Sequence, residues 1–255
     1  MTRRSYDQYC AIARALDAVG DRWALLIVRE LLAGARRYTD LHTDLPGIST
    51  DVLAARLKDL ERDGIVARHK LPPPGAATVY ELTPHGRGLL PVLTALADWG
   101  APALAERRPT DAVRAHWFAV PLMRLLSLSA RGRSGVVEVT LEEGAFHVRL
   151  GEADPGEAGP SYGDGPARDA DLRLAMDAGT CLAIVQGART LADAVADGSV
   201  RLTGQGPLAD ALMGALPAGG TGTPAADGTM LKIAADEQAP YGPDFVRETL
   251  REGRR

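Results

Sequence analysis

Leucines between residues 50 and 63 recur every three or four positions, which is the spacing of one face of an α-helix. Wound at 3.6 residues per turn, Leu53, Leu57 and Leu60 share one stripe. The opposite side is short-chained near its start and basic further along, and it carries Asp51, Ala54, Ala55, Lys58 and Arg62. This pattern predicts a helix that packs on a core through its leucines and presses its other side against a flat or grooved partner.

Two helices are predicted earlier in the chain. Residues 7–18 place Ile12 and Leu16 along one edge, and Val19 continues that edge. The stretch "RWALLIVRELLAG" is apolar around most of its circumference, so it predicts a central, largely buried helix that Asp21 caps and Gly34 ends. We interpret this second helix as scaffold rather than as part of a site.

A short helix and a tight turn precede the leucine-striped helix. "YTDLHTDL" offers Leu41 and Leu45 four residues apart, and Pro46 and Gly47 make a turn. Ser49 is a good N-cap for the helix that follows. A helix, a short turn and an amphipathic helix form the arrangement that DNA-binding helix-turn-helix proteins use.

The apolar period changes after Gly64. "IVARHKL" and "VYEL" are β-prone runs, and "PPPGAAT" between them has the composition of a hairpin loop. Thr83 and Pro84 then supply an N-cap and a first-turn proline for a helix from residue 84 to about 99, which Pro91 should kink. A recognition helix followed by a two-stranded ribbon predicts a winged helix, although a three-helix core with a hairpin can also serve protein contacts alone.

The second half predicts an α+β domain with helices on one side of a sheet. "WFAVPLMRLLSL" is a helix, and "GVVEVTLEEGAFHVRLG" alternates like two strands that turn at Glu143 and Gly144. "ADLRLAMD" and "GSVRLTG" are two further strands, with helices between and after them. The expected domains are a winged helix over 1–108, mainly α with a β-hairpin wing, an α+β domain over 109–217, and an extension over 218–255 that holds a linker and a short helix.

Composition narrows the function. Residues 1–108 carry 15 basic and 13 acidic side chains and the remainder carries 14 and 20, so the halves differ in sign. The two cysteines suggest no disulfide framework, and no signal peptide or membrane span is found, so we expect a cytoplasmic protein. The five histidines lack metal-ligand spacing and no catalytic set is found, so we expect neither an enzyme, nor a metal, nor a cofactor.

Taken together, these motifs resemble the HxlR family of bacterial transcriptional regulators. The resemblance covers roughly residues 6–104, from "CAIARALDAVGDRW" to "YELTPHGRGLLPVLTALADWG". It rests on a cysteine, a Gly-x-x-Trp, an Arg-aromatic pair, a Pro-Gly-Ile-Ser turn and a Leu-Thr-x-x-Gly stretch in order. The family implies a winged-helix homodimer that binds double-stranded operator DNA, with dimer contacts mostly from the terminal helices, here residues 7–18 and 84–104.

The DNA contacts follow from this expected fold. The alanines let the helix backbone approach the base edges, while Thr50, Asp51 and Lys58 supply polar groups to read them. Residues before and at the start of the preceding helix should meet phosphate, and Arg68 and Lys70 should place the base of the wing on the backbone. For Arg56 an ion pair within the domain and a DNA contact both remain open. The predicted set is Arg36, Arg37, Thr39, Ser49, Thr50, Asp51, Ala54, Lys58, Arg62, Arg68 and Lys70.

The second half resembles the sterol-carrier-protein-like fold over roughly residues 111–216, through the run that begins "DADLRLAMDAGTCLAIVQG". Such domains hold apolar ligands between sheet and helices, which implies an apolar effector that binds the DNA-competent and incompetent dimers unequally. Each candidate can equally be a core residue. The residues offered as a pocket lining are Trp117, Phe118, Met123, Leu126, Phe146, Val148 and Met176.

Cys10 offers a different switch. In some members of the family a cysteine at the matching place responds to electrophiles or oxidants. Arg3, Arg4 and Arg14 are close in sequence, and nearby cations can make a cysteine more reactive. A cysteine that only packs on an apolar helix face is the alternative. A further alternative is a small-molecule carrier whose first half mediates dimerisation without binding DNA.

Overall fold

The computed structural model describes residues 5–72, 77–104, 107–151 and 162–214. All of these belong to one compact unit, which spans residues 1–219. The expected linker and short helix of residues 218–255 lie outside the described residues. None of the described helices combines the length and the apolar run that crossing a bilayer requires.

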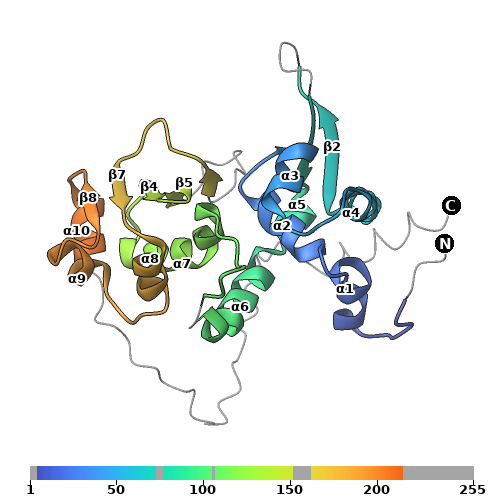
Figure 1. Cartoon of the computed structure of the whole chain (residues 1–255), viewed down its shortest axis with the longest axis horizontal. Helices are drawn as coiled ribbons and strands as arrows, with labels where there is room; N and C mark the ends of the chain where they lie inside the picture. Colours follow the sequence, from blue (N-terminus) through green and yellow to red (C-terminus); the bar gives the residue numbers. More distant parts are fainter. Residues whose placement is uncertain (1–4, 73–76, 105–106, 152–161, 215–255) are drawn as a thin grey trace, which may run out of the picture. The chain divides into compact units, whose positions relative to one another are not determined.

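The first half is a winged helix (Figure 1). Its elements are α1 (Ala11–Val19), α2 (Ala24–Leu32), β1 (Arg36–Arg37), α3 (Tyr38–Asp44), α4 (Thr50–Arg62), β2 (Val66–Lys70), β3 (Thr78–Leu82), α5 (Pro84–Arg87) and α6 (Leu90–Gly100). The three strands form an antiparallel sheet in the order β1-β3-β2, so the wing hairpin β2-β3 is extended by the two-residue strand that precedes α3. The two predicted wing strands are confirmed, whereas β1 was not predicted.

Two expectations about the first helices were wrong. Helix α1 begins at Ala11 instead of residue 7, because Ser5 and the backbone N–H of Tyr6 instead bond to the Asp17 carboxylate, both at 3.0 Å. Asp21 does not cap α2 with its side chain, since Trp23 is the N-cap residue and the Asp21 carboxylate forms an ion pair with Arg56.

The helix expected over residues 84–99 is divided into α5 and α6. Thr83 caps α5 as predicted, accepting a bond from Gly86 N–H at 3.1 Å. The chain then turns at Gly88 and Leu89, and Pro91 lies in the first turn of α6, where a missing N–H costs no helical bond. Proline therefore starts a new helix here instead of kinking a continuous one.

The second half is an α/β layer built on a five-stranded sheet in the order β6-β5-β4-β7-β8. Its strands are β4 (Gly135–Leu141), β5 (Gly144–Leu150), β6 (Tyr162–Asp164), β7 (Leu172–Ala175) and β8 (Arg201–Thr203). The helical elements are η2 (Ala115–Phe118), α7 (Ala119–Ala130), α8 (Ala178–Val185), α9 (Leu191–Ala196) and α10 (Pro207–Met213), while the short helix η1 (Ala101–Leu104) follows α6 in the first half. In Figure 1, α7 and α8 lie on the same side of β4 and β5, as expected.

The central strands of this sheet bury apolar side chains at alternate positions, although Glu138 between two of them on β4 is buried as well. Val137 and Val139 on β4 are fully buried against the helices, as are Phe146 and Val148 on β5. Strand β4 pairs in parallel with β7 and antiparallel with β5, while β6 at one edge was not predicted. The buried apolar side chains of both halves form one continuous cluster, so the two halves share a core.

Candidate nucleic-acid interface

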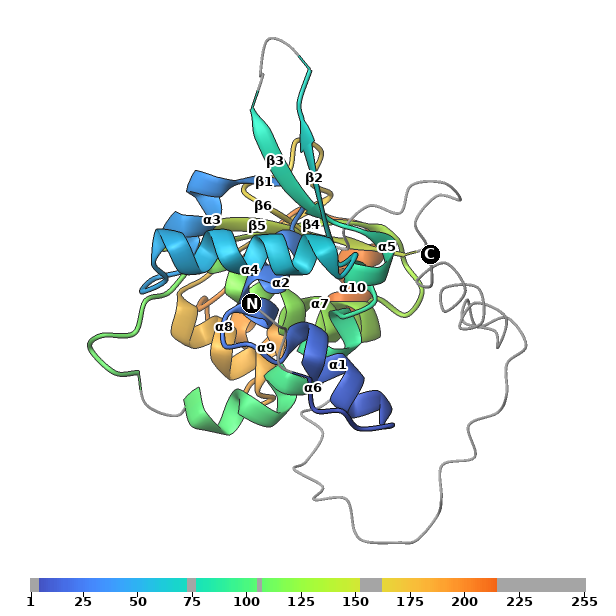
Figure 2. The ribbon, with the colours of Figure 1, turned by 90° about the vertical axis from the view of Figure 1, so that its right-hand side faces the viewer.

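Helix α4 has the leucine-striped form that the sequence predicts. Its stripe is buried, with Leu53, Leu57 and Leu60 at most 1% exposed. Ser49 caps it by accepting a bond from the N–H of Val52 at 3.3 Å. The stripe therefore fixes which side of α4 faces outward, and Figure 2 shows the helix lying across the front of the first half with the wing strands rising beyond it.

The outward side of α4 carries Asp51, Ala54, Ala55 and Lys58, all exposed. Its first turn is also held from α3, because the Tyr38 hydroxyl donates to the carbonyl oxygen of Thr50 at 2.7 Å. This side therefore presents short side chains and one long, positively charged side chain, that of Lys58. The start of the helix is held by the Ser49 cap and by the bond from Tyr38.

The basic residues of α4 are not equivalent. Arg56 forms ion pairs with Asp21 and Asp59, which is the structural alternative that the sequence left open for it. Arg62 pairs with Asp59 at 2.8 Å and with Asp63 at 3.5 Å. Within the described ranges, Lys58 is the only basic side chain of α4 with no such pair, so it is the cation on this helix most available to an outside anion.

The predicted phosphate contacts before α3 separate into two kinds. Arg37 and Thr39 are exposed, and the backbone N–H of Arg37 bonds to Asp40 at the start of the helix. Arg36 is only 9% exposed, and its guanidinium donates to the Glu30 carbonyl at 3.0 Å and pairs with Asp44 and Asp164, each at 2.9 Å. Its proposed role as a phosphate contact is withdrawn, because its charge is already used inside the chain.

The wing presents Arg68 and Lys70 on the outer part of β2, both exposed. The Arg68 guanidinium lies 6.0 Å from the ring centroid of Tyr80 on β3, and His69 is 3.7 Å from Glu81. Most of the loop between the strands, residues 73–76, lies outside the described residues. The wing therefore combines cations near its outer end with one acid, Glu81, part-way along it.

A buried carboxylate on α2 joins the two halves, and the sequence analysis missed it. Glu30 has no exposed surface, and its carboxylate accepts bonds from three residues. His116 Nε2 lies at 2.6 Å, Trp117 Nε1 at 2.9 Å and Arg29 Nη2 at 2.6 Å. The signal that would have found it is a single acid inside the apolar run "LLIVRELL", since such a group needs partners when it is buried.

Two further links lie beside Glu30. His116 Nδ1 is 3.3 Å from Asp164 on β6, whose other carboxylate oxygen meets Arg36. Arg114 approaches Asp44 at 3.3 Å and donates to the Thr43 carbonyl at the end of α3. We call Glu30, Arg36, Asp44, Arg114, His116 and Asp164 the interface cluster.

Within the interface cluster, the pKa values of His116, Glu30 and Asp164 are shifted. Burial tends to lower the pKa of His116, but hydrogen bonds and charge from Asp164 and Glu30 outweigh it and raise that pKa. Burial tends to raise the pKa of Glu30, and His116 and Arg29 outweigh it and lower that pKa. The bond with His116 likewise lowers the pKa of Asp164 to about 2. The charged form of each group is thus favoured in the folded chain.

These shifts predict a pH window for stability. A raised folded pKa means that the folded chain binds the His116 proton more tightly, so this stabilisation is complete below the ordinary value of 6.5 and is lost as pH rises through the folded pKa. The lowered pKa of Asp164 stabilises above 3.8 and is lost as pH falls towards 2. We expect Tm to fall from pH 6 to pH 9, and His116→Gln to reduce that fall. An unchanged slope in His116→Gln, compared with the control His85→Gln on exposed α5, would contradict the assignment.

The interface cluster is not a convincing metal site. Ligand atoms of Glu30, Asp44 and His116 lie within 4.8 Å of one another. However, the Glu30 carboxylate already pairs with Arg29 and the Asp44 carboxylate with Arg36, so a metal ion would have to displace both guanidinium groups.

The residues offered as an apolar ligand pocket are part of the core. Leu126, Phe146 and Val148 have no accessible surface, so no water-sized space lies beside them. Met176 is also buried, while Phe118 and Met123 are half-buried against the same cluster. Trp117 lies under Arg29, whose guanidinium is 4.4 Å from its ring centroid. As it stands, this set fills the space in which a ligand was expected.

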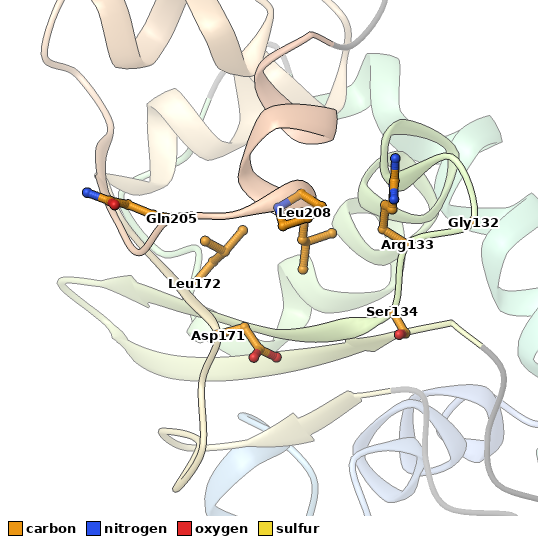
Figure 3. Close-up of a pocket in the computed structure, with 8 residues that line it drawn as sticks. Gly132, Arg133, Ser134, Asp171, Leu172, Gln205 and Leu208 are labelled. Carbon is orange, nitrogen blue, oxygen red and sulfur yellow. The ribbon is translucent and has the colours of Figure 1, made fainter.

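A separate hollow lies where β4 begins, lined by residues 132–134, 171, 172, 205, 207 and 208 (Figure 3). The Asp171 carboxylate there accepts a bond from Val136 N–H at 2.7 Å, and Arg133 points away from it. Its lining shares no residue with the apolar set that the sequence suggested, and we assign it no ligand.

Comparison with known proteins agrees with the architecture of the first half. Residues 18–108 match the HxlR-like helix-turn-helix model. YvaP, an uncharacterized helix-turn-helix transcriptional regulator of Bacillus subtilis, is 38% identical over 86 residues, which are 34% of this chain and 80% of that protein. The similar regulator sll1512 of Synechocystis is 39% identical over 94 residues, covering 35% and 70% of the two chains. The reduced form of the regulator YodB from B. subtilis is 34% identical, with a TM-score of 0.34 over 36% of this chain and 92% of that one.

These matches cover only the first half of the chain, so the resemblance of the second half to the sterol-carrier-protein-like fold stays a prediction. For the first half, an exposed helix face on a winged-helix scaffold agrees with the regulators that match it. The chain belongs to the HxlR-like helix-turn-helix family of transcriptional regulators.

Proposed function

We propose that the chain binds operator DNA sequence-specifically as a homodimer, with the outward side of α4 in the major groove. The observation that carries the proposal is that Ala54, Ala55 and Lys58 are exposed on a helix whose leucine stripe is buried. The alanine methyl groups allow close approach to the base edges and contact with thymine, while Lys58 can reach a guanine or a phosphate. Arg37, Thr39, Arg68 and Lys70 are the proposed backbone contacts.

Two of the proposed DNA-facing residues act indirectly. The Ser49 hydroxyl caps α4. Arg62 forms ion pairs with Asp59 and Asp63 at the C-terminal end of the same helix. Asp51 lies in the first turn of α4, where its negative charge interacts favourably with the positive end of the helix dipole. The same charge repels phosphate, so the proposed partner of Asp51 on DNA is the amino group of a cytosine. Thr50 is exposed beside it and completes the proposed reading surface.

Lys58→Ala tests this interface. We expect operator affinity to fall by about 1–3 kcal/mol if Lys58 contacts a base, and by less, with a salt slope smaller by about one, if it meets only phosphate. The measurement is a titration of labelled operator DNA at two salt concentrations. Arg201→Ala is the matched control, because it removes one exposed positive charge from β8 in the second half. Equal affinity of Lys58→Ala, the control and the unchanged protein would remove α4 from the proposed site.

The homodimer is supported by apolar side chains that the single chain leaves exposed. Ile12 on α1 is 71% exposed and Trp99 on α6 is 84% exposed, with Leu16, Val92 and Leu96 beside them in sequence. Exposed apolar groups of this size on two helices are typical of a surface that a second protein covers. We propose that a second copy of the chain covers it, which would place two α4 helices on successive half-sites.

The proposed regulatory input has two alternatives. An apolar effector in the second half would have to separate the closed packing around Leu126 and Phe146, and it stays a prediction. The alternative is a thiol switch at Cys10, which is exposed, whereas Cys181 is buried and its thiol pKa is raised to about 12 by burial. Only Cys10 of the two is therefore placed to react with a dissolved electrophile or oxidant. A carrier protein without DNA binding finds no support in the exposed face of α4.

A further inference from the structure

We infer that Asp164 of the second half positions the DNA-binding elements through Arg36, so that the second half sets the geometry of the helix-turn-helix without touching DNA. The inference rests on the proposed operator binding, and it concerns how that binding is controlled. The structural basis is one short strand, β1, which pairs with the wing strand β3, leads directly into α3 and is held from the second half.

Strand β1 connects the wing sheet to the start of α3. Arg36 pairs with Tyr80 and Arg37 with Val79 on β3, so β1 continues the sheet of the wing. The next residue, Tyr38, starts α3 and reaches the first turn of α4 through its bond to the Thr50 carbonyl. A shift of β1 therefore moves the wing, α3 and the start of α4 together.

Arg36 holds β1 in place through two hydrogen-bond acceptors and one further ion pair, on three different elements. Its guanidinium meets the Glu30 carbonyl on α2, the Asp44 carboxylate at the end of α3 and the Asp164 carboxylate on β6. Because Arg36 is buried, losing one of these partners leaves a charge that is expensive to keep out of water. The position of β1 thus depends on an acid that comes from the second half.

The halves also meet elsewhere, at Arg124–Asp98 and Gln186–Ala101, but several of their contacts lie around the same segment as Arg36. His116 connects Glu30 to Asp164, and Arg114 binds both the Asp44 carboxylate and the Thr43 carbonyl at the end of α3. The Tyr162 hydroxyl donates to the Arg29 carbonyl at 3.0 Å. The end of α3 is therefore tied directly to the second half by Arg114 and its start indirectly through Arg36, while the outward side of α4 remains exposed. This is the arrangement that we take as competent for DNA.

Asp164→Asn tests the inference in the full-length chain. The substitution keeps the shape of the side chain and removes the charge that meets Arg36 and His116. We expect the affinity for operator DNA to fall about fivefold or more. Without this charge β1 should adopt several positions, and only the fraction of molecules with β1 in the DNA-competent position would bind. Amide exchange of residues 36–50 in the free protein should become faster, and Asp164→Glu, which keeps the charge, should restore most of both properties.

Asp197→Asn is the matched control. It makes the same change in an aspartate that pairs with Arg189 inside the second half, so operator affinity and exchange at residues 36–50 should stay unchanged. If circular dichroism finds Asp164→Asn unfolded, Arg114→Gln takes its place, because Arg114 holds the other end of α3 from a half-exposed position. The same loss of affinity and the same faster exchange are then required.

The outcomes separate this inference from the proposed function. If Lys58→Ala weakens operator binding but Asp164→Asn and Arg114→Gln bind like Asp197→Asn, the positioning role is wrong and operator binding through α4 stands. If Lys58→Ala binds like the unchanged chain, the proposed interface itself fails. A loss of affinity in Asp164→Asn without faster exchange at residues 36–50 also overturns the inference, because the effect would then not pass through β1.

Discussion

Trp99→Asp is expected to leave the chain monomeric and to weaken operator binding by about 100-fold or more, since a monomer engages one half-site and loses the gain from linking two. Trp99 is the most exposed large apolar side chain of α6, and nothing in the described ranges covers it. A carboxylate placed there would have to be buried without a partner in the proposed dimer. Light scattering at several protein concentrations gives the mass, and a titration of operator DNA gives the affinity.

The control for this change is Thr203→Asp, which adds the same charge at an exposed position of β8. It should leave both the mass and the operator affinity unchanged. A Trp99→Asp protein that keeps the mass of a dimer would move the interface away from α6. A monomer that binds operator as tightly as the unchanged chain would remove dimerisation from the mechanism of DNA binding.

Glu30→Ala is expected to lower the free energy of unfolding by about 3–5 kcal/mol, which is the usual cost of breaking a buried ion pair by removing one partner. The change leaves His116, Trp117 and Arg29 without their shared acceptor in a buried place. Urea unfolding followed by tryptophan fluorescence measures the change, and Trp117 reports directly on this site.

Glu61→Ala is the matched control for Glu30, because it removes an exposed glutamate from α4 and should change stability by no more than about 0.5 kcal/mol. Glu30→Gln keeps the shape and one acceptor oxygen, so it should fall between the two. If Glu30→Ala were as stable as Glu61→Ala, the carboxylate would contribute nothing net, and the interface cluster would not hold the two halves together.

The sequence was sufficient for elements that local rules decide. The stripe of Leu53, Leu57 and Leu60, the Ser49 cap and the β-prone runs of the wing are all local patterns, and each is confirmed. The helix-turn-helix followed from their order along the chain. The exposure of the Ala54 and Lys58 side also followed, because a buried stripe leaves only one side to face outward.

The parts that the sequence could not provide depend on residues far apart in the chain. Arg36 looks like a phosphate contact in a basic pair, but the fold turns it inward onto the Glu30 carbonyl, Asp44 and Asp164, the last on an edge strand that was not predicted. Glu30 meets His116 across a separation of 86 residues, which no local periodicity reveals. The end of α5 was missed for a smaller reason, since Pro91 was expected to bend a helix and instead lies where a second one starts.

The shared core and the position of Glu30 bear on how this chain can be divided. Two of the groups that neutralise or hydrogen-bond Glu30 are found 86 and 87 residues later, beyond the last residue of the family match. A fragment that stopped at residue 108 would therefore keep a buried acid and lose those partners. In this protein the family's DNA-binding fold is not an interchangeable module, and grafting it onto another partner would require redesign of the inside of its second helix.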